Sequence, residues 1–364
     1  MKLAYLTAAR IPSERAHSIQ IVKTCEALGA MPDVSLALVA PRRRGRAGND
    51  VFLYHHLKKT FEIRYLPTID TVAWGRLGFW LHQLLFAKLS VLWLLYHRPE
   101  VVYGRDEAIL WFVQLFGFRV VWESHQGSLN WFARKLISEQ TRIVVISEGL
   151  RQHYLKNGVP AEQVYVAHDG VDLGEFQTTE TKEMARARLG LSASAQVALY
   201  IGSLDEWKGW RTLARSASHL RTCAVVIIGG TPLQVEEAKA EFPSVIFLGA
   251  RPYGELAANQ QAADVLVIPN TNTNKLSSTF TSPLKVFAHM ASGIPIVASD
   301  VPSIREVMDA TVATLVVPDD PEALACGIAE ALAPEAITKA VFAQEQVARY
   351  TWIERAKHIT AFLS

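Results

Sequence analysis

The sequence predicts two doubly wound α/β domains, each a parallel sheet covered by helices. Short apolar runs rich in β-branched residues alternate with helical patterns along the whole chain. Runs that are apolar throughout are typical of strands buried on both faces, as in parallel sheets. The chain has 364 residues, half of them hydrophobic, which is enough for two packed cores.

The expected strands fall into two sets. The polar stretch 178–195 separates them, which predicts a boundary after Phe176, with a first domain of residues 1–176 and a second of residues 177–350. A last helix within 351–364 follows the second domain and is in position to cross back to the first. The expected strands are 3–8, 34–40, 62–66, 100–104, 119–124, 142–147 and 163–170, then 197–203, 224–230, 245–250, 264–270, 294–299 and 314–317. Ligands bind beyond the carboxyl ends of such strands, so we expect a site in the cleft between the domains.

Residues 79–96 approach the length of a membrane span. Lys88, in the middle, would cost roughly 2.5–3.5 kcal/mol at the centre of a bilayer, so we expect a helix of the first domain instead. One face of this helix carries polar residues and aromatic rings: Phe79, His82, Gln83, Phe86, Ser90, Trp93 and His97. That face is either buried in the core or lies against lipid headgroups.

The net charge of +2 conceals an asymmetry. Residues 1–170 carry 21 Lys and Arg against 14 Asp and Glu, whereas residues 171–364 carry a net of −5. The densest basic tract, 42–46, is either a solvated loop or a contact with an anionic surface such as a membrane.

Cys25, Cys223 and Cys326 are odd in number and far apart, so we expect buried thiols in a reducing compartment and no disulfide framework. The first apolar run is too short for a signal peptide. We therefore expect a cytoplasmic protein, peripheral at the inner face of the membrane if its basic half contacts lipid.

Two lysines in the second domain are the main candidates for binding an anion. Ser282 is a good N-cap and Pro283 a good first residue for a helix that should run to about Ser292. A helix N-terminus favours phosphate, and Lys285 in the first turn is unfavourable unless an anion binds there. Lys208 lies in the loop after the first strand of this domain and offers a compact charge to a diphosphate. For either lysine alone, an ordinary surface role is the alternative.

In the first domain, His125 follows the strand 119–124, and a structural role is the alternative for a lone histidine. Other loops at strand ends add cations and a carboxylate at the same edge: Arg15, His17, Arg105 and Asp106. The chain has no G-x-G-x-x-G after its first strand, no P-loop and no G-x-S-x-G elbow. It also shows no metal-ligand spacing and no basic-aromatic pattern for nucleic acid, so neither a metal nor a nucleic acid is expected.

Together these motifs resemble the retaining, nucleotide-sugar-dependent glycosyltransferases of family 4. Their fold, GT-B, has two Rossmann-like domains facing across a cleft. The segments that carry the resemblance are IPSERAHSIQIVKTCEALG, VVYGRDEA, VVISEGLRQHYLKNGVPAEQVYVAHDGVDLGEF, LYIGSLDEWKGW, VVIIGG, VIFLGARPYGEL, AADVLVIPN and SPLKVFAHMASGIPIVASDVPSIREV.

The resemblance implies roles for individual residues on the donor side. Lys208 matches the lysine on the donor diphosphate, after Gly202, and Ser203 stands where the family has a basic residue. The start of the phosphate-binding helix corresponds to Ser282, Leu284 and Lys285. The loop that packs on the nucleotide base corresponds to Arg251, Pro252 and Tyr253.

On the acceptor side, the resemblance places His125 near the transferred sugar and Arg105 and Asp106 in the acceptor cleft. Arg15 and Ala16 replace a Gly-Gly pair near the diphosphate.

The largest departure concerns two glutamates of the family, replaced here by Phe280 and Ala288. The second normally hydrogen-bonds the ribose of the donor, a contact worth roughly 1.5–3 kcal/mol.

The resemblance therefore implies a metal-independent retaining transferase without a cofactor. It would move a hexose or N-acetylhexosamine from a nucleotide diphosphate sugar to a glycan or lipid-linked acceptor, in surface polysaccharide synthesis. Ala288 and Ser203 keep open a non-catalytic GT-B protein that binds a nucleotide or a partner, and a nucleotide-sugar epimerase shares the fold.

Overall fold

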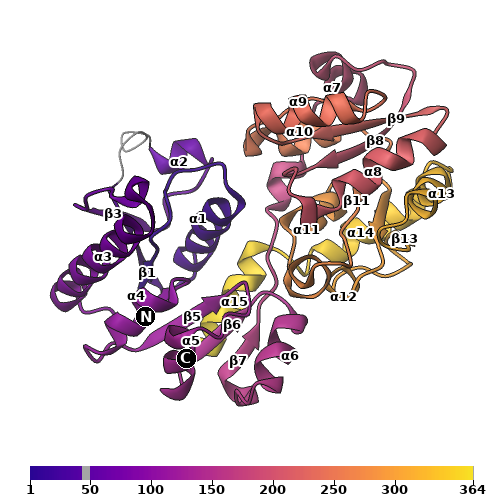
Figure 1. Cartoon of the computed structure of the whole chain (residues 1–364). Helices are drawn as coiled ribbons and strands as arrows, with labels where there is room; N and C mark the ends of the chain where they lie inside the picture. The colour runs from indigo at the N-terminus through magenta and orange to yellow at the C-terminus, as the bar shows by residue number, and fades with distance from the viewer. Residues whose placement is uncertain (43–49, 364) are drawn as a thin grey trace. The chain divides into compact units, whose positions relative to one another are not determined.

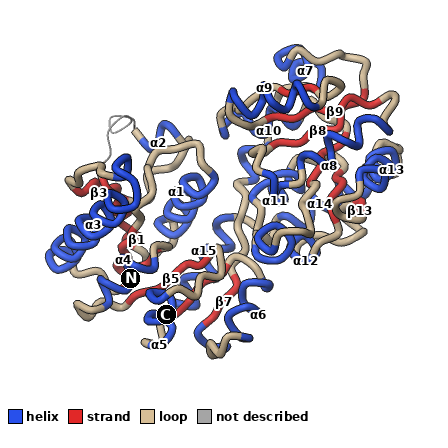
Figure 2. Tube along the Cα trace, in the orientation of Figure 1, coloured by secondary structure: helices blue, strands red, loops and turns tan. Residues whose placement is uncertain are grey.

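The computed structural model describes residues 1–42 and 50–363, which form two compact units (Figure 1). Unit 1 combines Met1–His168 with the C-terminal helix that begins at Trp352, and unit 2 comprises Asp169–Thr351. Both units are parallel sheets covered by helices (Figure 2), which confirms the predicted α/β class.

Unit 1 is built on a seven-stranded sheet in the order β3-β2-β1-β4-β5-β6-β7, and all neighbouring strands are parallel. Its strands are β1 (Lys2–Leu6), β2 (Ser35–Pro41), β3 (Glu62–Leu66), β4 (Val101–Gly104), β5 (Val120–Ser124), β6 (Arg142–Val145) and β7 (Val164–Val166). Its main helices are α1 (Ala16–Gly29), α2 (Val51–Tyr54), α3 (Gly75–His97), α4 (Glu107–Gln114), α5 (Trp131–Ser138), α6 (Glu148–Lys156) and α15 (Trp352–Leu363).

Unit 2 repeats this plan with a six-stranded parallel sheet in the order β10-β9-β8-β11-β12-β13. Its strands are β8 (Gln196–Ile201), β9 (Cys223–Ile228), β10 (Ile246–Phe247), β11 (Val265–Ile268), β12 (Ile296–Ser299) and β13 (Thr314–Val316). Its main helices are α7 (Lys182–Leu189), α8 (Trp210–Ser216), α9 (Pro232–Glu241), α10 (Leu256–Gln260), α11 (Leu284–Ala291), α12 (Pro302–Arg305), α13 (Pro321–Ala331) and α14 (Ala336–Val347).

Each sheet has a switch point where the strand order reverses. In unit 1, β1 lies between β2 and β4, and in unit 2, β8 lies between β9 and β11. Chains leaving the two strands at a switch point turn to opposite faces of the sheet, which opens a crevice at their carboxyl ends. The fold therefore offers one crevice in each unit, beside β1 and β4 and beside β8 and β11.

The division between the units falls earlier than the predicted boundary after Phe176. Val171, Leu173 and Phe176 pack against the apolar core of unit 2, so residues from 169 onward belong with that unit. The C-terminal helix α15 belongs to unit 1, where it packs along α1. Arg119 and Arg142 donate hydrogen bonds to the carbonyls of Leu363 and Phe362, respectively, near the end of this helix.

Helix α3 buries a side that combines His82 and Ser90 with apolar residues, and it also exposes an apolar side. His82, Phe86 and Ser90 are buried, and the His82 imidazole hydrogen-bonds the Ile69 carbonyl. The interpretation in which this face contacts lipid is therefore wrong. The opposite side exposes large apolar side chains: Leu77, Trp80, Leu81, Leu84, Leu92, Leu95 and Tyr96. By length and composition alone, Val72–His97 is also apolar enough to cross a membrane.

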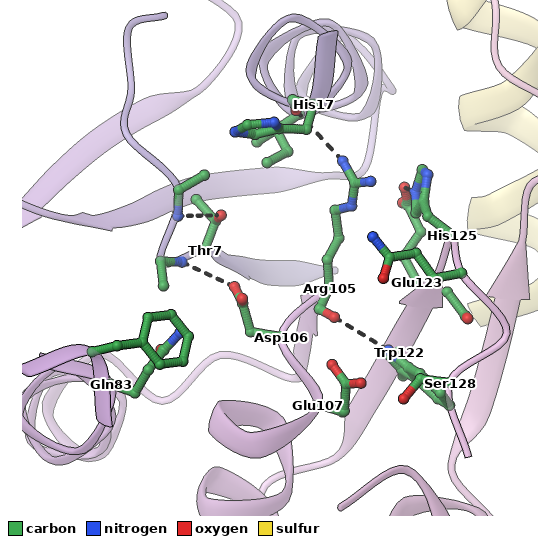
Figure 3. Close-up of a pocket in the computed structure, with 16 residues that line it drawn as sticks. Thr7, His17, Gln83, Arg105, Asp106, Glu107, Trp122, Glu123, His125 and Ser128 are labelled. Carbon is green, nitrogen blue, oxygen red and sulfur yellow. Dashed lines mark hydrogen bonds and ion pairs between the residues drawn. The ribbon is translucent and has the colours of Figure 1, made fainter. Parts of the chain in front are cut away.

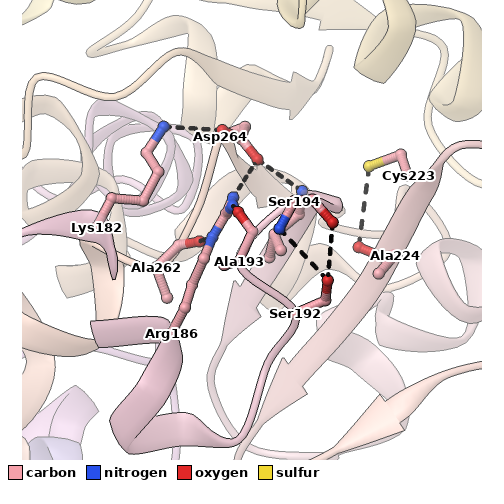
Figure 4. Close-up of polar contacts among 10 residues, drawn as sticks. Lys182, Arg186, Ser192, Ala193, Ser194, Cys223, Ala224, Ala262 and Asp264 are labelled. Atoms are coloured by element: carbon pink, nitrogen blue, oxygen red, sulfur yellow. Dashed lines mark hydrogen bonds and ion pairs between the residues drawn. The ribbon is translucent and has the colours of Figure 1, made fainter. Parts of the chain in front are cut away.

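A buried ion pair fixes α7 of unit 2 to the sheet (Figure 4). Asp264, just before β11, accepts hydrogen bonds from Lys182 and Arg186 of α7 at 2.8 and 2.6 Å. The backbone N–H of Val197 in β8 donates to the same carboxylate at 2.8 Å. One carboxylate therefore joins α7, β8 and β11.

Two further expectations concern the surface. Cys25 and Cys223 are buried as predicted, but Cys326 is exposed because it lies on the outer side of α13. Of the basic tract 42–46, residues 43–46 lie outside the described residues.

Candidate functional site

In unit 2, the loops that follow β8 and β9 meet at the switch point through glycines. Gly229 has φ of 142°, and a Cβ there would lie 1.7 Å from the carbonyl oxygen of Gly202. Gly209 has φ of +73°, and its Cβ would lie 1.6 Å from the Pro269 carbonyl oxygen. Only glycine fits at these close approaches. They draw the loop 202–209 against the end of β11.

The loop after β8 holds Lys208 in a short 3-10 turn, η4 (Glu206–Lys208). The Lys208 ammonium lies 3.7 Å from the centre of the Trp207 ring. Burial lowers its pKa to about 8, although Asp205 acts in the opposite direction. Ser203, at the position of the family's basic residue, donates its hydroxyl hydrogen bond to Asp205 at 2.7 Å.

Lys285, in the first turn of α11, places its ammonium in the interior. The nitrogen lies 4.7 Å from the centre of the Tyr200 ring, and it has no hydrogen-bond acceptor among residues 1–42 and 50–363. Burial, and then the positive charge of Lys208, lower the pKa of Lys285 well below its usual value. Lys208, in the turn after β8, therefore repels Lys285 at the start of α11.

The start of α11 differs from the prediction in one detail. The helix begins at Leu284 with Pro283 as its N-cap, and no side chain caps it. The Ser282 hydroxyl instead accepts a hydrogen bond from the backbone N–H of Asp169 at 3.0 Å. Ser282 thus ties α11 to the start of unit 2, while the first turn of α11 keeps its positive dipole end uncapped by side chains.

The other residues predicted to bind the donor differ in how exposed their side chains are. Arg251 and Pro252 are exposed before the turn η6 (Tyr253–Glu255). Tyr253 is half-buried, and burial followed by Glu175 and Asp172 raises its pKa. Ala288 is buried, and its methyl group offers no hydrogen bond to a donor.

His289, next to Ala288 in the chain, is also buried. Its Nδ1 lies 2.8 Å from the Gln260 side-chain nitrogen, and burial followed by the charge of Lys285 lowers its pKa to about 3. His289 therefore does not replace the family's ribose-binding glutamate.

Unit 1 contains a cavity of about 510 Å³ at the carboxyl ends of β1, β4 and β5 (Figure 3). Four predicted residues line it: His17, Arg105, Asp106 and His125. Arg15 does not line this cavity, because it is the exposed N-cap residue of α1. Helix α3 contributes Phe79 and Gln83 to the wall, which the sequence did not indicate.

Hydrogen bonds fix the cations and the carboxylate of this cavity. Arg105 donates to the Gln20 side chain at 2.7 Å, and Asp106 accepts from the backbone N–H of Ala8 at 2.9 Å. Burial, then Arg105 and Arg15, lower the pKa of His17. The cavity thus combines the hydrogen-bonded Arg105 guanidinium, the hydrogen-bonded Asp106 carboxylate and the neutral His17 imidazole.

His125 is joined to a buried carboxylate. Its Nε2 lies 2.6 Å from Glu123, and Arg355 of α15 lies 3.3 Å from the same oxygen. Burial and Arg105 lower the pKa of His125 to about 3. Burial alone would raise the pKa of Glu123, but Arg355 and His125 outweigh it and hold that pKa well below its usual value.

Sequence reasoning missed both Glu123 and Arg355. The signal for Arg355 is its place on the apolar face of α15, three residues after buried Trp352 and one before buried Ala356. Glu123 lies near the end of β5, after the apolar residues Val120, Val121 and Trp122. In the described part of the chain, no three His, Cys, Asp or Glu residues are grouped so that they could hold a metal ion.

Two family profiles match the chain, one in each half. The profile described as Glycosyltransferase Family 4 matches residues 19–175, and the profile described as Glycosyl transferases group 1 matches residues 195–333.

Curated relatives match over part of their length. D-inositol 3-phosphate glycosyltransferases of Corynebacterium urealyticum and Mycolicibacterium gilvum are 28% and 27% identical over 62% and 60% of this chain. The matches cover 54% and 50% of those relatives, so the chain spans about half the length of the curated relatives that it matches.

Solved structures share the fold over the whole chain. Sucrose-phosphate synthase from Thermosynechococcus elongatus has a TM-score of 0.78 at 20% identity, covering 100% of this chain and 98% of that one. The Anabaena protein HepE, solved in complex with UDP and glucose, has a TM-score of 0.75 at 18% identity, covering 100% and 99%. Together with the two parallel sheets, these likenesses establish the GT-B architecture.

Proposed function

Because this chain belongs to the glycosyltransferases of family 4, we propose that it transfers a sugar from a nucleotide diphosphate sugar to a hydroxyl group of an acceptor. The observation that carries the proposal is the buried ammonium of Lys285. It lies beside Lys208 at the start of α11, without an acceptor among the described residues. A buried cation without a partner is costly, and a bound diphosphate would relieve that cost.

The same two lysines support a route in which no metal ion is needed. Departure of a nucleoside diphosphate develops negative charge on its terminal phosphate. Two ammonium groups and the helix dipole would stabilise that charge in a preorganised site. We propose transfer of a hexose or N-acetylhexosamine with retention, in which the acceptor hydroxyl attacks on the face that the phosphate leaves. The departing phosphate would accept the hydroxyl proton.

The cavity in unit 1 is our candidate for the acceptor. Its guanidinium and carboxylate suit a hydroxylated or phosphorylated head group. Phe79 and Gln83 connect its wall to α3, whose outer side is apolar. We therefore propose a lipid-linked or membrane-associated glycan acceptor and a location at the inner face of the cytoplasmic membrane.

The donor is tested by thermal stabilisation and calorimetry with UDP-glucose, GDP-mannose and ADP-glucose. UDP-glucose is the first probe because HepE was solved in complex with it. Binding of one donor that is lost in Lys285→Met, and kept in Lys239→Met on the exposed side of α9, supports the site. Equal binding by both variants contradicts it.

Transfer is tested with the radiolabelled donor that binds. A lipid-extract acceptor and D-inositol 3-phosphate, the substrate named for the relatives, are compared. Product from the lipid fraction only supports the acceptor proposed here, whereas product from inositol phosphate only overturns it. Donor binding without hydrolysis or transfer would favour the non-catalytic alternative, for which Ala288 is the structural reason.

A further inference from the structure

Behind His125, three elements that are distant in the chain bring charges together inside unit 1. β5 supplies Glu123, α15 supplies Arg355, and the loop after β4 supplies Arg105. The side chains of Glu123 and Arg355 are 1% and 2% exposed. Burying two charges is favourable only with close pairing and further hydrogen bonds. Packing alone therefore does not explain why Glu123 and Arg355 are buried here.

Glu123 divides its two oxygens between three partners. Oε1 lies 2.6 Å from His125 Nε2 and 3.3 Å from a terminal nitrogen of Arg355. Oε2 accepts a hydrogen bond from the Tyr103 hydroxyl at 2.5 Å. His125 and Arg355 thus meet at one oxygen of one buried carboxylate.

Anchoring of α15 does not by itself account for Arg355. The end of this helix is held elsewhere, by hydrogen bonds from Arg119 and Arg142 and by stacking of Phe362 on Tyr165 at 5.1 Å. An apolar side chain at 355 would continue the buried face of Trp352, Ala356 and Ile359. The Arg355 guanidinium instead pairs with the Glu123 carboxylate, which also binds His125.

We propose that Arg355 is a positioning residue, which acts through Glu123 to hold His125 as a neutral imidazole with its proton on Nε2. Arg355 keeps Glu123 ionised, so the carboxylate accepts the Nε2 proton and leaves Nδ1 as the acceptor of the ring. The C-terminal helix thereby sets the state of a side chain in the cavity. The consequence for catalysis rests on the proposed transferase function, but the state of the ring does not.

The charges around the ring agree with this assignment. Arg105 and Arg355 oppose a second proton on His125, and Glu123 favours one. Arg355 itself faces Glu123 and Tyr103, and its charge also reaches His168. Removal of Arg355 leaves Glu123 with less opposing charge, so the pKa of His125 must rise.

The test is a ¹⁵N NMR titration of the full chain, in which the histidine ring nitrogens report tautomer and protonation. In the wild type we expect His125 to keep one proton, on Nε2, down to about pH 5. In Arg355→Met we expect it to take up a second proton between about pH 5 and 7. His125→Gln assigns the signal. Lys357→Met is the matched control, because Lys357 is on α15 but pairs with Glu354 at 2.6 Å.

Activity supplies the second measurement. We expect Arg355→Met to lower kcat more than tenfold on the acid side of the profile, with little change in the KM of the donor, and Arg355→Lys to restore most of it. In the Glu123→Gln background, Arg355→Met should have little further effect. That double variant removes both charges together, and its comparison with Glu123→Gln shows what Arg355 does without the carboxylate. It should then show a mixture of His125 tautomers.

An unchanged tautomer and titration of His125 in Arg355→Met, or in Arg355→Gln if the methionine variant is unfolded, overturns the proposal. The same holds if Lys357→Met shifts His125 equally. Should the wild type transfer no sugar, the transferase proposal fails alone, because the NMR measurement still decides the role of Arg355.

Discussion

Lys285 lies where a positive charge is unfavourable in the folded protein without a ligand. Its ammonium lies over the Tyr200 ring, near a second lysine and at the positive end of a helix. The second lysine and the helix end both disfavour the charge, and only the ring favours it. Such an arrangement is stable only because the rest of unit 2 imposes it, as is common at binding sites.

Replacement of Lys285 by methionine should therefore stabilise the protein while it removes donor binding. We expect the free energy of unfolding to rise by roughly 1–3 kcal/mol, because a buried polar group without a partner is lost. The donor Kd should rise at least tenfold, because a charge-assisted contact worth roughly 1.5–3 kcal/mol disappears. Denaturant unfolding and calorimetry check the two effects. A variant that loses both stability and binding would contradict this account.

Donor affinity should fall as the pH rises above about 8. The pKa of Lys208 is about 8 in the free protein, and a bound diphosphate raises it. Below pH 8 the lysine is protonated in both states, so its contribution to affinity is constant. Above pH 8 the free protein loses the proton that binding requires. Calorimetry from pH 6.5 to 9.5 measures the fall, and Lys208→Arg, which keeps its charge, should lack the part that belongs to Lys208.

The charged residues of the two sites differ in how well the sequence predicts them. Local patterns predict Lys208, in the loop after a strand, and Lys285, in the first turn of a helix that Ser282 and Pro283 mark. They do not predict Glu123 and Arg355, because the pairing of these residues joins β5 to a helix at the far end of the chain. No local pattern specifies such a contact.

At the scale of elements, α3 is the exception to ordinary packing. A surface helix usually carries apolar residues on its inner side only, but α3 buries Phe86 and Leu94 and also exposes leucines on its outer side. Its sequence has Arg76 and Lys88 and no acidic residue. Two cations without a carboxylate favour an anionic lipid surface over a neutral one. The sequence identified the helix but not which side faces outward, because both sides contain large apolar residues.

The apolar side of α3 should bind membranes. We expect the wild type to sediment with vesicles of phosphatidylcholine and phosphatidylglycerol, and Leu81→Asp with Leu92→Asp to reduce binding at least tenfold. Leu233→Asp, at an equally exposed leucine of α9, is the control. Loss of binding in the control, or its persistence in the α3 variant, would argue against a membrane surface.

The attachment of α7 depends on Asp264. Asp264→Asn should lower the free energy of unfolding by about 3 kcal/mol at pH 7, because it leaves the buried Arg186 without its counter-charge. The pKa of Asp264 lies below its usual value. The difference from wild type should therefore be full above about pH 4 and shrink as the pH falls further. Asp300→Asn removes an exposed pair with Arg305 and should cost less than about 1 kcal/mol.

At the scale of the whole molecule, the two units differ in how the chain builds them. Unit 2 is one continuous segment with its own core. Unit 1 consists of two segments, one before and one after unit 2 in the sequence. The strand pattern predicted both sheets. It did not place residues 169–176, because Val171 and Leu173 pack on unit 2 through contacts far along the chain.

The two units should therefore differ in whether they fold as isolated fragments. Residues 169–351 should fold alone, with a cooperative thermal transition. Residues 1–168 should not reach native protection in hydrogen exchange until a peptide of residues 352–364 is added, because Glu123 lacks Arg355. Peptide carrying Arg355→Met should restore less protection than the native peptide does. Full protection of residues 1–168 without any peptide would show that α15 is dispensable.

The return of α15 to unit 1 also orders events on the ribosome. Glu123 leaves the exit tunnel long before Arg355, and all of unit 2 is synthesised in between. The nascent first unit therefore holds an interior carboxylate without the cation Arg355 throughout most of translation. Unit 1 is completed only after unit 2 has been made, which would delay a complete cavity until both units of the protein exist.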